Sequence, residues 1–190
     1  MTRRNLLRSQ LTKAWKESIN GAYKQQRINS ERSLQASIWS ELNKLFSDIP
    51  RRMFIEPSLS IHEKNSNGAN ARKHRIPDLV ICNSVEIIGI VEMKYQPRGK
   101  PDYKKDLETL EWIADHAESL TVSNARYRGK ETDAKPYKLS KSVVYVWAGV
   151  HSDATVSLPI PEKIKYNFLE LHAVTGISTD PKLIVRSKYN

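Results

Sequence analysis

The sequence has one cysteine, Cys82, among its 190 residues, so an internal disulfide is excluded and a reducing compartment is expected. Its five histidines are scattered along the chain, which argues against a zinc site. It has no run of 18 apolar residues, as a membrane-spanning helix would need. It also has no Gly-x-x-x-x-Gly-Lys loop, the signature of one common nucleotide site. These absences predict a cytoplasmic protein with no membrane partner and no nucleotide cofactor.

The charge balance is strongly positive. The chain carries 31 Lys and Arg against 21 Asp and Glu, a formal net charge of +10, which favours a polyanionic partner such as nucleic acid. Its length and 39% hydrophobic content suit one domain with a real core. We therefore expect a single domain over residues 1–190, with a basic helical extension at 1–28 and a basic loop at 121–140.

The most informative stretch runs from Arg75 to Tyr95. Two short runs of branched apolar residues, 79–82 and 87–91, are separated by the turn formers Asn83 and Ser84, which predicts a β-hairpin.

A hairpin centred near Val85 places Asp78 and Glu92 opposite each other, because each lies seven positions from that centre. Directly opposed residues have Cβ atoms about 5 Å apart. Lys94 lies on the same face as Glu92, since side chains alternate along a strand. The pattern therefore predicts two carboxylates and one amine converging at one end of the hairpin.

Two carboxylates at this separation repel each other unless something positive lies between them. A hard divalent cation suits such a pair and keeps positions open for water and phosphate oxygens. With an ammonium group beside it, the arrangement favours metal-assisted hydrolysis of a phosphodiester. The alternative is a surface hairpin with ordinary solubilising charges.

The motif Pro77-Asp78, thirteen intervening residues and then Glu92-Met93-Lys94 resembles the signature of the PD-(D/E)XK nuclease superfamily. The resemblance implies an α/β fold of the restriction-endonuclease-like type, an αβββαβ core with a central mixed sheet flanked by helices. It implies Mg²⁺, with Mn²⁺ able to substitute, held by Asp78, Glu92 and the backbone carbonyl of Met93. Lys94 would orient or help deprotonate the attacking water and stabilise charge on phosphorus.

The first core helix is expected over residues 31–46, after the cap residues 29–30. Glu31 falls within its apolar stripe and Glu41 near the edge of that stripe. A carboxylate on a buried face needs a partner. In the resembled superfamily a first-helix glutamate often points at the metal, and this role is assigned to Glu31, with Glu41 as second choice. The alternative for Glu31 is a first-turn acid that stabilises the helix dipole.

The remaining chain shows alternating helical and strand periodicities. The expected elements are an amphipathic helix within 1–27, a strand over 52–63 with a break at Pro57, a turn or loop at 64–72, a helix from 101 or 102 to about 120, a strand over 141–151, a short helix over 161–172 and a last strand at 183–185. The pattern Tyr103-x-x-Asp106-Leu107 is interpreted as structural, packing its helix on the sheet.

Several basic residues flank these motifs and are candidate phosphate contacts. His74 is a candidate catalytic helper. For His74 and for these basic residues, the alternative is an exposed side chain with no role in binding or catalysis. The predicted nucleic-acid-binding residues are Arg72, Lys73, Arg75, Arg98, Lys100, Arg126 and Arg128.

The sequence thus favours a metal-dependent DNA nuclease, an endonuclease of a prokaryotic or phage restriction, defence, mobile-element or repair system. Two alternatives stay open: a catalytically inactive DNA-binding module with the same fold, and a nuclease that acts on RNA. A homodimer is suggested only by analogy, because restriction-type and resolvase-type enzymes usually work as dimers.

Overall fold

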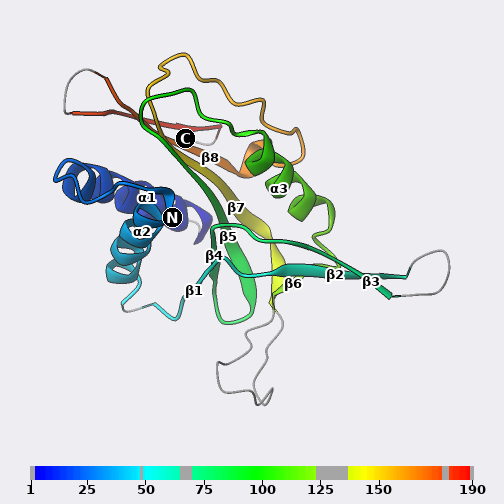
Figure 1. Ribbon diagram of the computed structural model, residues 1–190. Coiled ribbons are helices and arrows are strands. Elements are labelled where there is room, and N and C mark those ends of the chain that lie inside the picture. The colour runs from blue at the N-terminus through cyan, green and yellow to red at the C-terminus, as the bar shows by residue number, and fades with distance from the viewer. Residues whose placement is uncertain (1–2, 48, 65–69, 123–136, 177–179, 189–190) are drawn as a thin grey trace.

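The computed structural model describes residues 3–47, 49–64, 70–122, 137–176 and 180–188. Helices α1 and α2 come first along the chain, a run of strands follows, and α3 separates that run from the remaining strands (Figure 1). The elements are α1 (Arg3–Ser18), the π-helix η1 (Ile19–Tyr23), α2 (Glu31–Leu45), β1 (Arg52–Ile55), β2 (Leu59–Lys64), β3 (Asn70–Arg75), β4 (Leu79–Cys82), β5 (Glu86–Gln96), α3 (Lys104–Asp115), β6 (Thr121–Val122), β7 (Lys138–His151), the 3₁₀-helix η2 (Lys165–Asn167), β8 (Phe168–Val174) and β9 (Lys182–Ser187).

A mixed sheet forms the centre of the molecule, with strand order β1-β4-β5-β7-β8-β9. The pairs β1·β4, β4·β5 and β8·β9 are antiparallel, whereas β5·β7 and β7·β8 are parallel. The parallel connections place β5, β7 and β8 in the interior of the sheet, where both faces are covered. The fold is therefore α/β, with a six-stranded mixed sheet flanked by helices.

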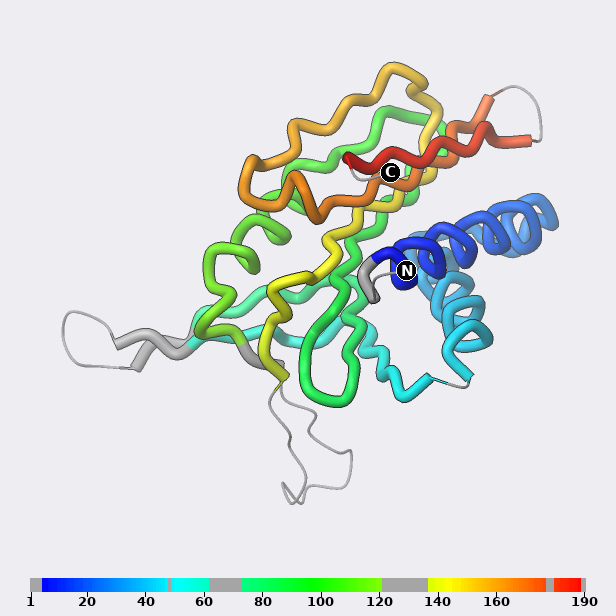
Figure 2. The backbone as a smooth tube through the Cα atoms, turned by 180° about the vertical axis from the view of Figure 1, so that it is seen from behind, coloured from blue at the N-terminus to red at the C-terminus, as the bar shows by residue number. Residues whose placement is uncertain are grey.

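Helices α1 and α2 lie on one side of the sheet and α3 lies on the other (Figures 1 and 2). The first side buries the apolar stripe of each helix, including Leu11 and Trp15 of α1 and Leu34 of α2. The second side packs Leu110 of α3 against Trp147 of β7. The amphipathic helix predicted within 1–27 is thus present as α1, and it packs on the core.

The start of α2 follows directly from its sequence. The Ser30 hydroxyl accepts a hydrogen bond from the Ser33 amide, and the Ser33 side chain accepts one from the Ser30 amide. This reciprocal cap satisfies amide groups that the first turn would otherwise leave unpaired. It confirms the predicted cap and fixes Glu31 at the first position of the helix.

The β4–β5 hairpin has the register that the spacing predicted. Leu79 pairs with Val91 and Val80 with Ile90, so the ladder continues in register toward Asp78 and Glu92. A register shift between Ile81 and Cys82 is confined to the turn end of the hairpin. The irregularity therefore leaves the end that carries the carboxylates undisturbed.

The strand predicted over 52–63 is two strands in two different sheets. β1 ends at Ile55, Glu56 adopts a positive φ of 47°, and β2 then begins a three-stranded sheet of order β3-β2-β6. The break falls beside Pro57, which cannot donate to a ladder. Part of the loop predicted at 64–72 is also strand, because β2 extends to Lys64 and β3 begins at Asn70. β2 and β3 project as an arm beyond the main sheet (Figure 1).

The helix predicted over 161–172 is wrong. Only the single turn η2 is helical there, and Phe168–Val174 forms β8, with every residue buried. A strand covered on both faces lacks alternation, so its apolar run resembles a buried helix segment. The helix predicted from 101 or 102 to about 120 is shorter than expected, because α3 covers only Lys104–Asp115.

The predicted basic loop at 121–140 is partly strand. Residues 121–122 form β6 and 138–140 belong to β7, while 123–136 lie outside the described residues. The strand predicted over 141–151 is therefore the later part of β7, and β9 contains the predicted last strand. Among the described residues, no helix is both long enough and apolar enough to cross a membrane.

Candidate active site

The candidate site lies where β5 extends past the start of its neighbour β4. β4 begins at Leu79, opposite Val91, so the later part of β5 has no strand partner on that side. Two carboxylates take the place of the missing strand: Asp78 Oδ2 accepts from the Met93 amide at 2.5 Å, and Glu31 Oε2 accepts from the Tyr95 amide at 3.3 Å. Unpaired strand amides therefore hold both acids at the edge of the sheet.

The backbone carbonyl of Met93 belongs to the same edge. In an antiparallel ladder the amide and carbonyl of one residue address the same neighbour. Because the Met93 amide reaches Asp78, its carbonyl also faces the side on which Asp78 lies. This position suits the ligand role that the sequence resemblance implies for Met93.

Asp78 and Glu92 form a carboxyl pair. Burial raises the pKa of Asp78 to about 6, although hydrogen bonds from the Met93 amide and from Glu92 oppose the rise. Glu92 is only 6% exposed, and burial together with the nearby charges of Asp78 and Asp106 raises its pKa well above its usual value. Two neighbouring carboxyls in such a place share a proton, because the doubly ionised pair is costly.

Lys94 lies between two further carboxylates. Its Nζ atom is 3.5 Å from Asp106 Oδ1 and 3.7 Å from Glu31 Oε2. Burial alone would lower the pKa of Lys94, but the charges of Asp106 and Glu31 outweigh burial and raise it. The amine is therefore an ammonium ion at neutral pH.

Asp106 is a site residue that sequence reasoning assigned to packing alone. It is buried, with Oδ2 accepting a hydrogen bond from the Trp147 indole at 3.1 Å while Oδ1 faces Lys94. Burial raises the pKa of this carboxyl, and Lys94 and Trp147 oppose that rise. A signal was present in the sequence: Asp106 lies in the apolar stripe of its helix, and a buried acid needs a partner.

Trp147 is itself held in place by the backbone beneath it. The space above Gly149, two residues along β7, is filled by the Trp147 ring, and a Cβ at Gly149 would lie 2.1 Å from a ring carbon. Only glycine fits here, so the close contact fixes the indole that holds Asp106. The position of Lys94 thus depends on the packing of α3 against β7.

Helix α2 contributes one predicted and one unpredicted contact. Glu31 reaches Lys94, whereas Glu41, the second choice, forms an ion pair with Lys44 at 2.7 Å on its own helix. Gln35, one turn after Glu31 and buried, donates to the Asp78 backbone carbonyl at 2.7 Å. α2 therefore braces the start of β4 as well as supplying an acid.

A hollow of about 370 Å³ opens onto this site. Its lining includes both Glu31 and Asp78, so these acids have access to solvent while Glu92 and Asp106 stay buried behind them. The hollow is lined by Ser30, Glu31, Arg32, Gln35, Glu56 and Asp78.

No group of three or more His, Cys, Asp or Glu side chains within the described ranges is arranged to hold a metal ion. The donors at the open edge are instead the paired carboxyls of Asp78 and Glu92 and the Met93 carbonyl. All are hard oxygen donors, which suit Mg²⁺, an ion that retains several waters. The set fits such an ion once the proton shared by the carboxyls has left.

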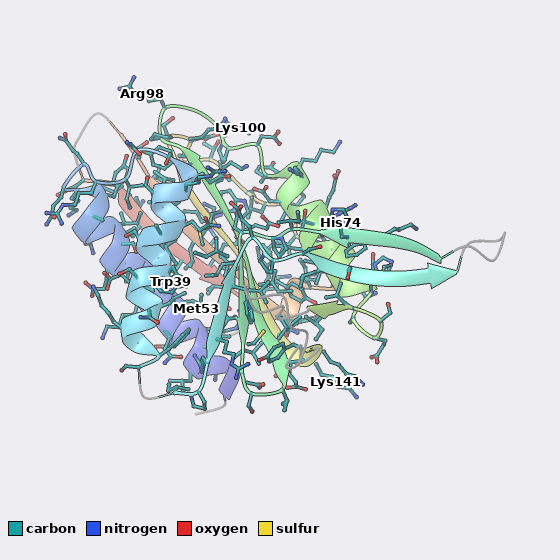
Figure 3. The ribbon with its side chains drawn as sticks, turned by 60° about the horizontal axis from the view of Figure 1, so that its bottom comes forward. Trp39, Met53, His74, Arg98, Lys100 and Lys141 are labelled. Atoms are coloured by element: carbon teal, nitrogen blue, oxygen red, sulfur yellow. The ribbon has the colours of Figure 1, made fainter. Side chains whose placement is uncertain are left out.

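The predicted phosphate contacts are only partly described. Lys73, Arg75, Arg98 and Lys100 are exposed, and the Arg75 guanidinium lies 5.1 Å from the Trp112 ring centre. Arg98 and Lys100 extend from the loop after β5, and His74 lies on the β3 side of the site (Figure 3). His74 is exposed, and its role as a catalytic helper stays a prediction. The Arg72 side chain, Arg126 and Arg128 lie outside the described residues.

Comparison with protein-family models, with curated proteins and with solved structures found no match to this chain.

Proposed function

We propose that the protein is a metal-dependent nuclease that hydrolyses phosphodiester bonds in DNA, with a restriction-endonuclease-like core and endonuclease action. The observation that carries the proposal is the carboxyl pair Asp78–Glu92 at the open edge of β5, beside the ammonium of Lys94. A buried pair of acids with raised pKa values is costly for folding, and such costs concentrate at functional sites.

Asp78, Glu92 and the Met93 carbonyl would hold Mg²⁺ or Mn²⁺, which when bound would polarise the phosphate and lower the pKa of a coordinated water. For this both carboxyls must be ionised, so their shared proton leaves on loading. Glu31, at the mouth of the hollow, would act on the same ion through water.

Lys94 would stabilise the negative charge that develops on the phosphate oxygens. Its two carboxylate neighbours favour this electrostatic role over that of a general base, because they hold the proton on the amine. Asp106 would keep the ammonium aimed at the site, since its own orientation is fixed by the Trp147 indole.

DNA is the proposed substrate because a net charge of +10 favours a polyanion and exposed cations lie on both sides of the site. The proposed system is restriction, defence, mobile-element or repair in a prokaryote or phage. A dimer remains part of the proposal by analogy alone.

The test is cleavage of supercoiled and linear plasmid with Mg²⁺, Mn²⁺ or EDTA by the wild type, Asp78→Asn and Lys94→Ala. We expect metal-dependent nicking, reduced by roughly 1000-fold in either variant, since each removes a group acting directly on the reacting phosphate. Glu41→Gln is the matched control, because it removes a carboxylate from the same helix outside the site.

Equal cleavage by the wild type and Lys94→Ala would overturn the assignment. Tight, salt-sensitive DNA binding without cleavage of plasmid, branched DNA or RNA would favour a binding module instead. Cleavage of RNA alone would keep the chemistry and change the substrate.

A further inference from the structure

A second hollow of about 540 Å³ lies beside the candidate active site, within the size range of small-molecule sites. It is formed by η1 and the turn after it, the end of β5, the end of β8 and the start of β9. These segments lie at one end of the molecule (Figures 1 and 2). Its lining residues include Tyr23, Gln26, Tyr95, Arg98 and Thr175.

Two tyrosine rings meet in this hollow. The ring centres of Tyr23 and Tyr95 are 6.4 Å apart, at an angle of 67°, and the Tyr95 hydroxyl donates to the Ile28 carbonyl at 2.9 Å. The second ring is thus fixed in place and presents aromatic surface to the hollow. Aromatic surface of this kind binds nucleobases by stacking, with little dependence on sequence.

The wall that carries Tyr23 is built from unusual backbone. Residues 19–23 form a π-helix, and Gln26 has a positive φ of 58°. A π-helix is rare in proteins, and a positive φ is rare for a residue other than glycine. Both conformations are found disproportionately at functional sites. The irregular turn directs its side chains toward the hollow, since both Tyr23 and Gln26 line it.

The hollow lies next to the hollow of the candidate active site, because Asn29 lines the first and Ser30 lines the second. The Tyr95 amide donates to Glu31, and Tyr95 directly follows Lys94 in β5. Arg98 supplies positive charge at the exposed rim, where the sugar–phosphate chain would pass. A nucleotide whose phosphate lies at the carboxyl pair could therefore place a neighbouring base between these walls.

We infer that this hollow binds one nucleobase of the substrate strand next to the phosphate that is cleaved. The inference rests on the proposed nuclease function for its location, but base binding itself can be measured without cleavage. The hollow would thus select for an unpaired or flipped-out nucleotide.

The first experiment measures binding of dAMP and dTMP to the metal-free protein by ligand-observed NMR, with deoxyribose 5-phosphate as the phosphate-only probe. We expect both nucleotides to bind more tightly than the probe. Tyr23→Leu should weaken nucleotide binding about tenfold by removing the stacking ring, while Tyr23→Phe should keep it. Tyr166→Leu, at an exposed tyrosine outside the hollow, is the matched control. Thermal unfolding of each variant checks its fold.

The second experiment places an abasic site at each position around the cleaved bond in a DNA oligonucleotide. We expect one position at which loss of the base slows the wild type about tenfold but has no effect on Tyr23→Leu. Nucleotides that bind no better than deoxyribose phosphate, or a Tyr23→Leu protein that binds them normally, would overturn the inference. Nucleotide binding that depends on Tyr23 in a protein without nuclease activity would support the hollow and overturn the proposed function instead.

Discussion

Two groups of ionisable side chains, one partly buried and one fully buried, contact Trp147, and they differ in how their charge is balanced. The carboxylate cluster consists of Asp78, Glu92 and Asp106 around Lys94. The histidine cluster consists of His151, Glu170 and His172, in which His151 Nε2 lies 3.0 Å from His172 Nδ1 and His172 Nε2 lies 3.1 Å from Glu170 Oε2. Trp147 donates to Asp106 and packs its ring 5.3 Å from the His172 ring.

The histidine cluster contains a ring without charge, His151. Burial and the neighbouring His172 lower the pKa of His151 to about 4, so this ring is uncharged at neutral pH. The Glu170 carboxylate also faces the Arg186 guanidinium at 3.5 Å. Each of the three side chains thus has a partner within the cluster or at Arg186, although the buried Nδ1 atom of His151 has none among the described residues.

The carboxylate cluster is not balanced in this way. Three acids face one ammonium, and the pKa values of Asp78, Glu92 and Asp106 are all raised. A fold gains nothing from placing so many acids together, at the cost of raised pKa values, unless a cation or a reaction uses them. The difference identifies the first cluster as the functional candidate and the second as part of the scaffold.

The largest effect on stability is expected from Asp78→Asn in the metal-free protein. The pKa of Asp78 is raised to about 6 from 3.8, so the folded state binds the proton more tightly than the unfolded chain. The resulting stability is fully present below pH 4 and is lost as the pH rises through 6. At pH 7.5 the variant should be more stable than the wild type by about 2 kcal/mol, since asparagine needs no ionisation.

Urea denaturation in EDTA at pH 4 and at pH 7.5 measures this effect. The gain from the substitution should be present at pH 7.5 and absent or reversed at pH 4. A variant less stable than the wild type at both values would mean that the carboxyl is structural, and would break the distinction between the clusters.

A smaller effect, now on catalysis, is expected from Asp106→Asn. The substitution keeps the shape of the side chain but removes a charge 3.5 Å from Lys94, so cleavage should fall about 10- to 100-fold. Because Asp106 helps to raise the pKa of Lys94, the alkaline limb of the pH–rate profile should move to lower pH. Trp147→Phe keeps an aromatic ring but removes the indole donor and part of a fully buried ring system, so its unfolding is measured as a control, and it should shift the profile less. An unchanged pH profile in Asp106→Asn would assign the residue to packing, as its sequence pattern first suggested.

The parts of the site that depend on local spacing could be predicted from the sequence. The opposed positions of Asp78 and Glu92 follow from a symmetric hairpin, and the placement of Glu31 follows from a cap and an apolar stripe. Both predictions use the regular spacing of side chains along a single strand or helix, which can be counted in the sequence. The residues themselves favour metal-assisted hydrolysis of a phosphodiester, and the resemblance adds the expected metal ligands and the nuclease class.

The parts that depend on contacts between distant elements could not be predicted. Asp106 meets Trp147 only because α3 packs across β7, a contact between residues 41 positions apart. The apolar run of β8 predicts a helix rather than a strand, because its burial on both faces is a property of the whole sheet. An acid within an apolar stripe is the local sign of such a contact. It predicts that the acid has a buried partner but not which residue that partner is.

The smallest effect on cleavage is expected from Glu170→Gln in the histidine cluster. The amide can still meet His172, but it no longer offers a charge to Arg186, so the free energy of unfolding should fall by about 1–2 kcal/mol. Cleavage at a temperature well below unfolding should stay within about twofold of the wild type, because Trp147 remains packed over Gly149 and still donates to Asp106. Paired measurements of urea denaturation and plasmid nicking separate the two effects. A tenfold loss of cleavage without loss of stability would mean that the clusters act together through Trp147, and that the polar network of the active site extends to β8.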